Sequence, residues 1–219
     1  MNPSRSMSLT LHGESFWISP YVFSCYVALR EKGLPFAMET VALHKAEQHQ
    51  NPFRDLSLTA QVPVLVHDGF WLGESLAIME YLEETFPAPT YPRLLPADPQ
   101  QRARARHLQA WLRSDLLPLR EERPTTTIFY RRPTTPLSPA GRVAMEKLLR
   151  VAGLLIHDGA TTLFGAWSLA DADLALALQR LLANGHDVPA KLRHFAEVQW
   201  ARPSVQEFVT HARPPFVPH

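Results

Sequence analysis

Five prolines between Phe86 and Pro99 divide the 219-residue chain into two parts of different character. They stand at positions 87, 89, 92, 96 and 99. Each proline fixes φ and removes a backbone donor, so neither a helix nor a strand can continue through this segment. Strand and helix patterns alternate before it, and only helical patterns follow it. The sequence therefore predicts two domains, residues 1–86 and 98–219, joined by a linker at 87–97.

The first part predicts an α/β domain. Alternating apolar residues favour strands, Ser19-Pro20 is typical of a helix start, and Gly69 is placed to turn a hairpin. Strands are expected at residues 8–12, 36–43, 64–66 and 70–72, and helices at 20–32 and 75–86. The polar stretch 44–56 can hold a further helix. The resulting order, β-α-β-α-β-β-α, is that of a thioredoxin-like domain.

The second part predicts an all-α domain. Helical periodicity and capping residues place helices at 99–117, 139–157, 169–183, 190–200 and 204–212. The Thr- and Pro-rich stretch 123–136 is expected to be a surface loop. Ser168 and Asp171 have the spacing of a capping box, in which each side chain pairs with a backbone N–H of the other residue.

Composition excludes several classes of protein. The hydrophobic fraction of 46% and charged fraction of 20% are those of a globular chain with a sizeable core. No stretch approaches the ~20 apolar residues of a membrane span, and Met1 to Ser8 lack the apolar run of a secretory signal. We therefore expect a cytoplasmic protein that does not bind membranes. The net charge of +1 gives no indication of nucleic-acid binding.

Cofactor motifs are absent from the sequence. The single cysteine, Cys25, rules out a disulfide framework and a multi-cysteine zinc site, and its apolar neighbours favour a buried, unreactive thiol. The ten histidines include no H-E-x-x-H pair, and neither a P-loop nor a G-x-G-x-x-G run occurs. Neither a metal nor a nucleotide cofactor is expected.

Three short motifs could bind a small peptide with an anionic sulfur. A serine at a helix start, Ser19, places its hydroxyl beside unpaired N–H groups that stabilise an anion. Val62-Pro63 precedes a strand, where a cis bond would turn the Val62 backbone towards a ligand. Glu74-Ser75 opens a helix that could hold an amino-acid head group. Each motif alone also fits a purely structural role, as a helix cap or a strand start.

Together these motifs resemble the glutathione transferases. Gln61-Val62-Pro63-Val64-Leu65 and Glu74-Ser75-Leu76-Ala77-Ile78 are similar to the segments that bind glutathione in that family. Ser19-Pro20-Tyr21 resembles the serine-type active-site helix, and Ser168 to Asp171 resembles the family's capping box. The stretch from Arg104 to Pro124 is similar to the bacterial YfcF-type subgroup.

The resemblance implies a homodimeric enzyme that uses glutathione as a substrate. Ser19 would stabilise the thiolate, and the glutathione-binding residues would be Gln61, Val62, Pro63, Glu74 and Ser75. The thiolate would attack a small electrophile or a peroxide held against the helical domain, which implies a role in detoxification and oxidative stress. Two alternatives stay open: glutathione-dependent disulfide reduction, and a catalytically silent binding or regulatory protein.

Two groups of residues have no single assignment. The glycine end of glutathione could be contacted by any of four polar side chains, His44, Lys45, His49 or Gln61. A face of the first predicted helix of the second domain carries three arginines, which could be a solvated face or could face the cleft or a phosphate. These arginines are Arg102, Arg106 and Arg113.

Overall fold

The computed structural model describes residues 7–217, which form two compact units. The first unit contains residues 7–92 together with the C-terminal residues 211–217, and the second contains residues 93–210. The sequence prediction assigned every residue after 98 to the helical domain. The structure differs at the C-terminus, because residues 211–217 pack on the first unit.

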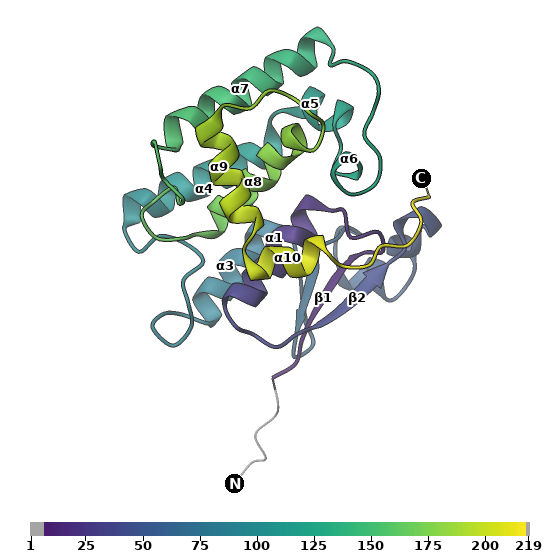
Figure 1. Ribbon diagram of the computed structural model, residues 1–219. Coiled ribbons are helices and arrows are strands. Elements are labelled where there is room, and N and C mark those ends of the chain that lie inside the picture. The colour runs from purple at the N-terminus through teal and green to yellow at the C-terminus, as the bar shows by residue number, and fades with distance from the viewer. Residues whose placement is uncertain (1–6, 218–219) are drawn as a thin grey trace. The chain divides into compact units, whose positions relative to one another are not determined.

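The first unit is built on a four-stranded sheet with the order β2-β1-β3-β4. Its strands β1 and β2 are labelled in Figure 1. The strands are β1 (Leu9–Glu14), β2 (Ala37–Val41), β3 (Val64–His67) and β4 (Phe70–Gly73). The β1–β2 pair is parallel, as the predicted βαβ unit requires, and β3 is antiparallel to both β1 and β4. The predicted hairpin is therefore the β3–β4 pair.

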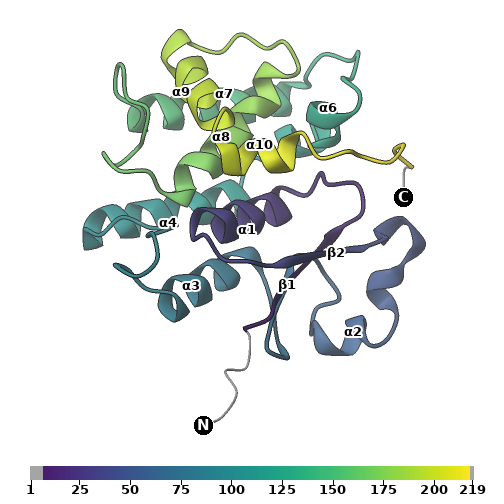
Figure 2. The same ribbon diagram turned by 60° about the horizontal axis from the view of Figure 1, so that its bottom comes forward.

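Helices cover both faces of this sheet (Figure 2). On one side lie α1 (Pro20–Glu31) and α3 (Ser75–Thr85), and on the other lies the short α2 (Phe53–Leu56). Two single-turn 3₁₀ helices, η1 (Leu43–Lys45) and η2 (Glu47–His49), precede α2. Apolar residues of β1, β3 and α3, such as Leu11, Leu65 and Ile78, are fully buried between the sheet and α1. The predicted thioredoxin-like order is confirmed.

Register brings the loops that carry the predicted motifs to one edge of the sheet. His12 of β1 lies opposite Val64 at the start of β3, and Val64 lies opposite Gly73 at the end of β4. Glu14 at the end of β1 lies beside Val41 at the end of β2. The loop after β1, the loop before β3 and the loop after β4 therefore leave the sheet at the same edge.

The proline-rich segment is anchored to the first unit by Lys32. This lysine, at the C-terminal end of α1, is 1% exposed, and its Nζ donates to the carbonyls of Phe86 (2.8 Å) and Pro92 (3.0 Å). It also forms an ion pair with Glu83 of α3 at 2.8 Å. In the sequence, Lys32 is only the last residue of the predicted helix 20–32, and nothing there indicates these contacts.

The second unit is entirely helical within residues 93–210, apart from an isolated bridge between Phe164 and Ala166. Its helices are α4 (Pro99–Ser114), α5 (Leu117–Glu122), α6 (Thr126–Phe129), α7 (Pro139–Leu155), α8 (Leu169–Leu182), α9 (Ala190–Trp200) and α10 (Pro203–Val209). Most of α8 is buried, and α4, α7 and α9 all pack against it. The predicted all-α composition is confirmed.

The prediction differs from the structure around residues 115–136. The first predicted helix was extended to Leu117, but α4 ends at Ser114 and Leu116 has a φ of 62°, which interrupts the helical conformation. The stretch 123–136 was predicted to be a loop, and it contains the single turn of α6. Such one-turn helices lack a periodic apolar face and so leave little pattern in the sequence.

Candidate functional site

Ser19 lies at the N-terminus of α1, where the sequence predicted it. Its backbone is extended, and Pro20 takes the first helical position. The Ser19 Oγ accepts a hydrogen bond from the Val22 N–H at 3.3 Å, so the hydroxyl proton stays available for donation. The half-buried side chain therefore presents a donor at the positive end of a 12-residue helix.

A buried carboxylate, Glu14, holds the loop that leads to Ser19. Its side chain accepts from the N–H groups of Phe16 (2.7 Å), Ile18 (2.5 Å) and Ser19 (2.8 Å), and the residue is 4% exposed. Burial raises the pKa of Glu14, and the backbone N–H groups oppose that rise. Glu14 was not among the predicted site residues, although an acidic residue shortly after the predicted strand 8–12 was a signal for it.

Val62 and Pro63 stand just before β3, and the peptide bond between them is cis, as predicted. Pro63 is buried, Val62 is half-buried against the core cluster of Val41, Phe53 and Val64, and Gln61 is exposed. The packing of Val62 and Pro63 thus fixes the loop before β3, and the neighbouring Gln61 side chain is exposed to solvent.

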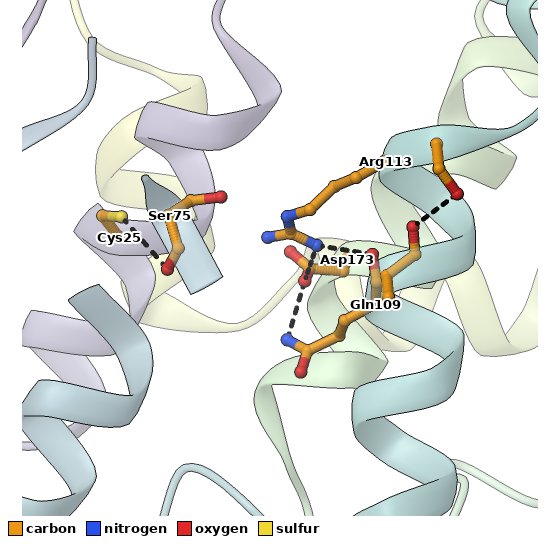
Figure 3. A network of polar contacts seen from close by, with 7 residues as sticks. Cys25, Ser75, Gln109, Arg113 and Asp173 are labelled. Carbon is orange, nitrogen blue, oxygen red and sulfur yellow. Dashed lines mark hydrogen bonds and ion pairs between the residues drawn. The ribbon is translucent and has the colours of Figure 1, made fainter. Parts of the chain in front are cut away.

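Glu74 and Ser75 form the junction between β4 and α3. Glu74 is exposed with a φ of 66°, and Ser75 is buried as the first residue of α3. The Ser75 carbonyl accepts a weak hydrogen bond from the Cys25 thiol of α1 at 4.0 Å (Figure 3). Cys25 is 2% exposed, which agrees with its interpretation as a buried thiol.

Three of the four candidates for contacting the glycine end of glutathione lie in the segment after β2. His44 and Lys45 are in η1, His49 is in η2, and the His44 ring packs on Phe16 at 4.9 Å. Because β2 ends at the same sheet edge as β1, this segment starts beside the loop that leads to Ser19. Gln61 lies before β3 at that edge too, so the geometry does not separate the four candidates.

The three arginines of α4 have different surroundings. Arg113 donates to Asp173 Oδ2 at 3.1 Å and to the Gln109 carbonyl at 3.0 Å, and Gln109 itself donates to Asp173 at 2.8 Å (Figure 3). Arg113 is therefore part of a polar network that joins α4 to α8. Arg102 is half-buried and Arg106 is exposed, so the three do not act as one group.

The capping box of α8 is present in both halves. The Asp171 carboxylate accepts from Ser168 N (2.7 Å), Ser168 Oγ (2.8 Å) and Leu163 N (2.6 Å). All of these contacts lie inside the helical unit, and they satisfy two backbone N–H groups and the Ser168 hydroxyl. Their role is to fix the start of the central helix.

A cavity of about 560 Å³ lies on the α2 side of the sheet. The His12 ring stacks on Trp71 at 5.1 Å in its wall, and Phe53 also lines it. None of the predicted site residues lines this cavity, so it is separate from the candidate site. Residues 7–217 contain no cluster of three His, Cys, Asp or Glu side chains able to hold a metal, and no helix among them is long and apolar enough to cross a bilayer.

Comparison with known proteins identifies the family. Residues 18–85 match the glutathione S-transferase N-terminal domain, and residues 98–213 match the glutathione S-transferase C-terminal domain. The chain belongs to the glutathione S-transferase family. This family relationship was predicted from the motifs above, while the YfcF-type subgroup stays a prediction.

Solved structures in this family resemble the chain over nearly its whole length. A glutathione transferase homologue from Burkholderia gl BGR1, crystallised with bound glutathione, is 46% identical with a TM-score of 0.78, and the match covers 93% of this chain and 97% of that one. Maleylacetoacetate isomerase from Methylobacterium extorquens AM1, solved with malonate and glutathione, is 28% identical with a TM-score of 0.71, covering 94% and 98%.

Curated relatives match over a shorter region. The maleylacetoacetate isomerase of Rattus norvegicus is 40% identical over 107 residues, which is 48% of each chain. The chain thus spans about half the length of the curated relatives it matches.

Proposed function

We propose that this protein is a glutathione transferase in which Ser19 stabilises the glutathione thiolate. The Ser19 hydroxyl, which accepts from Val22 N, keeps its own proton to donate to the sulfur. The positive end of the α1 dipole adds to this stabilisation, so the bound thiol ionises at a lower pH than free glutathione.

The other predicted motifs would hold the peptide. The Val62 backbone pairs with the cysteinyl group, with Pro63 and Gln61 flanking it. The first-turn N–H groups and hydroxyl at Ser75 bind the γ-glutamyl carboxylate, and the Glu74 side chain accepts from the ammonium group. The observation that carries this proposal is the common sheet edge of the three loops. The Burkholderia homologue with bound glutathione supports it.

The chemical step is nucleophilic attack by the thiolate. With an electrophilic carbon, a C–S bond forms, the leaving group departs with its electron pair, and the thiol proton passes to solvent. With a peroxide, sulfur attacks oxygen and the O–O bond breaks to give an alcohol and a sulfenic acid. A second glutathione then forms glutathione disulfide and water. The helical unit, residues 93–210, would select the second substrate, and the enzyme would be a cytoplasmic homodimer acting in detoxification.

A second candidate function is glutathione-dependent isomerisation, because relatives from several organisms carry the name maleylacetoacetate isomerase. The same thiolate would add to an activated cis double bond, the single bond would rotate, and elimination would release the trans product and unchanged glutathione. This reaction needs the same bound thiolate and differs only in the second substrate.

Calorimetric titration with glutathione followed by a turnover screen tests the proposal. The screen contains a halogenated dinitrobenzene, an organic hydroperoxide, a small disulfide and a cis-enedione acid. Binding and turnover of the first or second substrate support the transferase. Turnover of the disulfide or the cis acid alone indicates the reductase or the isomerase, and binding without any turnover indicates a silent binding protein. Absence of glutathione binding at millimolar concentration overturns the proposal.

A further inference from the structure

The C-terminal segment, residues 211–217, contacts the loop between β1 and α1 that leads to Ser19. Figures 1 and 2 both show this segment beside the loop between β1 and α1. Arg213 donates from Nε (3.1 Å) and Nη2 (3.0 Å) to the carbonyl of Trp17, and from Nη1 to the His211 carbonyl at 3.0 Å. Two guanidinium N–H groups thus converge on one carbonyl, a strong and directional arrangement.

Trp17 needs external support for its backbone conformation. Its φ of 54° lies in the left-handed region, which bulky residues rarely adopt. The Trp17 ring is 7% exposed and stacks on the His211 ring at 3.6 Å. The neighbouring Phe16 ring packs edge-on against Phe216 at 5.2 Å. The C-terminal segment therefore covers both aromatic residues of the loop.

One peptide unit in this loop is held at both ends. The Trp17 carbonyl and the Ile18 N–H belong to the same planar peptide group. Arg213 binds its oxygen, while the Glu14 carboxylate accepts from its N–H. The same carboxylate oxygen also accepts from Ser19 N at 2.8 Å. The 17–18 peptide and Ser19, the N-cap residue of α1, are therefore held by the same carboxylate oxygen.

We propose that Arg213 is a positioning residue of the glutathione site, which clamps the 17–18 peptide against Glu14 and so fixes Ser19 and the α1 N-terminus for thiolate stabilisation. The inference rests on the proposed function of Ser19. Preorganised donors stabilise a developing or bound anion without reorganising, so a loosened loop would weaken the thiolate even with Ser19 intact. The C-terminal segment is then part of the active-site architecture of the first unit.

The experiment compares Arg213→Met and Arg213→Lys with the wild type. Methionine keeps much of the apolar stem and removes every donor, while lysine returns one flexible cation. Arg54→Met is the matched control, because Arg54 pairs with Asp55 on the surface of the same unit. Two readouts are needed: hydrogen exchange of the Ile18 and Ser19 amides in the protein without glutathione, and the ultraviolet titration of the bound thiol.

Arg213→Met should speed exchange of these two amides about tenfold to a hundredfold, as expected for lost charge-assisted hydrogen bonds, and should raise the pH at which bound glutathione ionises. Arg213→Lys should show the same two changes to a smaller extent, and Arg54→Met should change neither the amide exchange nor the thiol titration. If Arg213→Met leaves the exchange of the Ile18 and Ser19 amides unchanged, Arg213 does not hold the 17–18 peptide and the proposal is wrong. Faster exchange with an unchanged thiol titration overturns the positioning role. If the wild type binds no glutathione, the proposed function fails, and the exchange data alone decide whether the clamp exists.

Discussion

Replacing Ser19 with alanine should separate thiolate stabilisation from helix capping. The substitution removes the Oγ, which accepts from Val22 N at the long distance of 3.3 Å, and with it the proposed donor to sulfur. It keeps Pro20, the first-turn N–H groups of α1 and the hydrogen bond from Ser19 N to Glu14, because these belong to the backbone or to other residues. The variant therefore tests a single hydroxyl.

The expected loss follows from the kind of hydrogen bond removed. A hydrogen bond to a charged group contributes ~1.5–3 kcal/mol, so kcat/KM at neutral pH should fall about tenfold to a hundredfold. Glutathione affinity should be largely kept, because the proposed contacts at Val62, Glu74 and Ser75 are untouched. The deficit should shrink as pH rises towards the ordinary thiol pKa of ~8.5, where glutathione ionises without help.

Steady-state kinetics across pH, with one electrophile and one peroxide, measure this effect. Ser138→Ala is the matched control: Ser138 precedes Pro139, and its Oγ accepts from Gly141 N at 3.0 Å at the start of α7. Both variants should lose ~1 kcal/mol of stability through the lost cap. Ser138→Ala should lose more, because Ser138 Oγ also donates to Glu122 Oε1 at 2.5 Å, but only Ser19→Ala should lose turnover. If Ser19→Ala equals the wild type on every substrate that turns over, Ser19 is only a helix cap.

Three further predictions concern stability measured by urea unfolding. Burial raises the pKa of Glu14 in the folded state above its ordinary value of 4.5. The folded state therefore keeps the Glu14 proton to a higher pH than the unfolded state does, and the wild type loses stability as pH rises from 4.5 through the folded-state pKa. The advantage of wild type over Glu14→Gln should therefore shrink with rising pH, and a widening gap would contradict this. Lys32→Met should cost ~3–5 kcal/mol by removing the buried cation that pairs with Glu83, and adding Glu83→Gln should recover part of it; a cost below ~1 kcal/mol would show that the buried pair is unimportant. Ser168→Ala should cost ~1 kcal/mol with unchanged turnover per folded molecule, whereas lost turnover at unchanged stability would assign the Asp171 segment to catalysis.

Local patterns predicted the features that depend on neighbours in sequence. The predicted helices 20–32, 99–117 and 139–157 each start at a proline that follows a capping residue, which is Ser19, Asp98 or Ser138. In each, the cap side chain accepts the expected N–H of the first turn. The order of strands and helices along the chain followed from the alternation of their patterns, and the hairpin from its glycine turn. These signals are readable because the interacting residues are at most a few positions apart.

Contacts between distant positions were not predictable in the same way. Lys32 has the sequence context of any basic helix end, yet its Nζ reaches carbonyls 54 and 60 positions later. Arg213 contacts a carbonyl 196 positions earlier, and the C-terminal stretch that carries it gives no periodic signal. Nothing in the local pattern distinguishes such side chains from solvated ones, because burial is decided by the packing of the whole unit.

Glu14 and Arg213, which bind opposite ends of the 17–18 peptide, also resolve an electrostatic conflict in the proposed site. A buried carboxylate beside the start of α1 opposes an anionic sulfur there, and its own burial is unfavourable, as the raised pKa shows. Three backbone N–H groups share its charge, and a guanidinium binds the far end of one of those peptides. The peptide dipole between them is thus aligned from cation to anion, which favours both charges. An apolar residue at position 14 would remove the conflict but would take away the carboxylate that accepts from the Phe16, Ile18 and Ser19 N–H groups. The carboxylate is therefore the better solution for the loop, and the guanidinium of Arg213 makes it compatible with a thiolate.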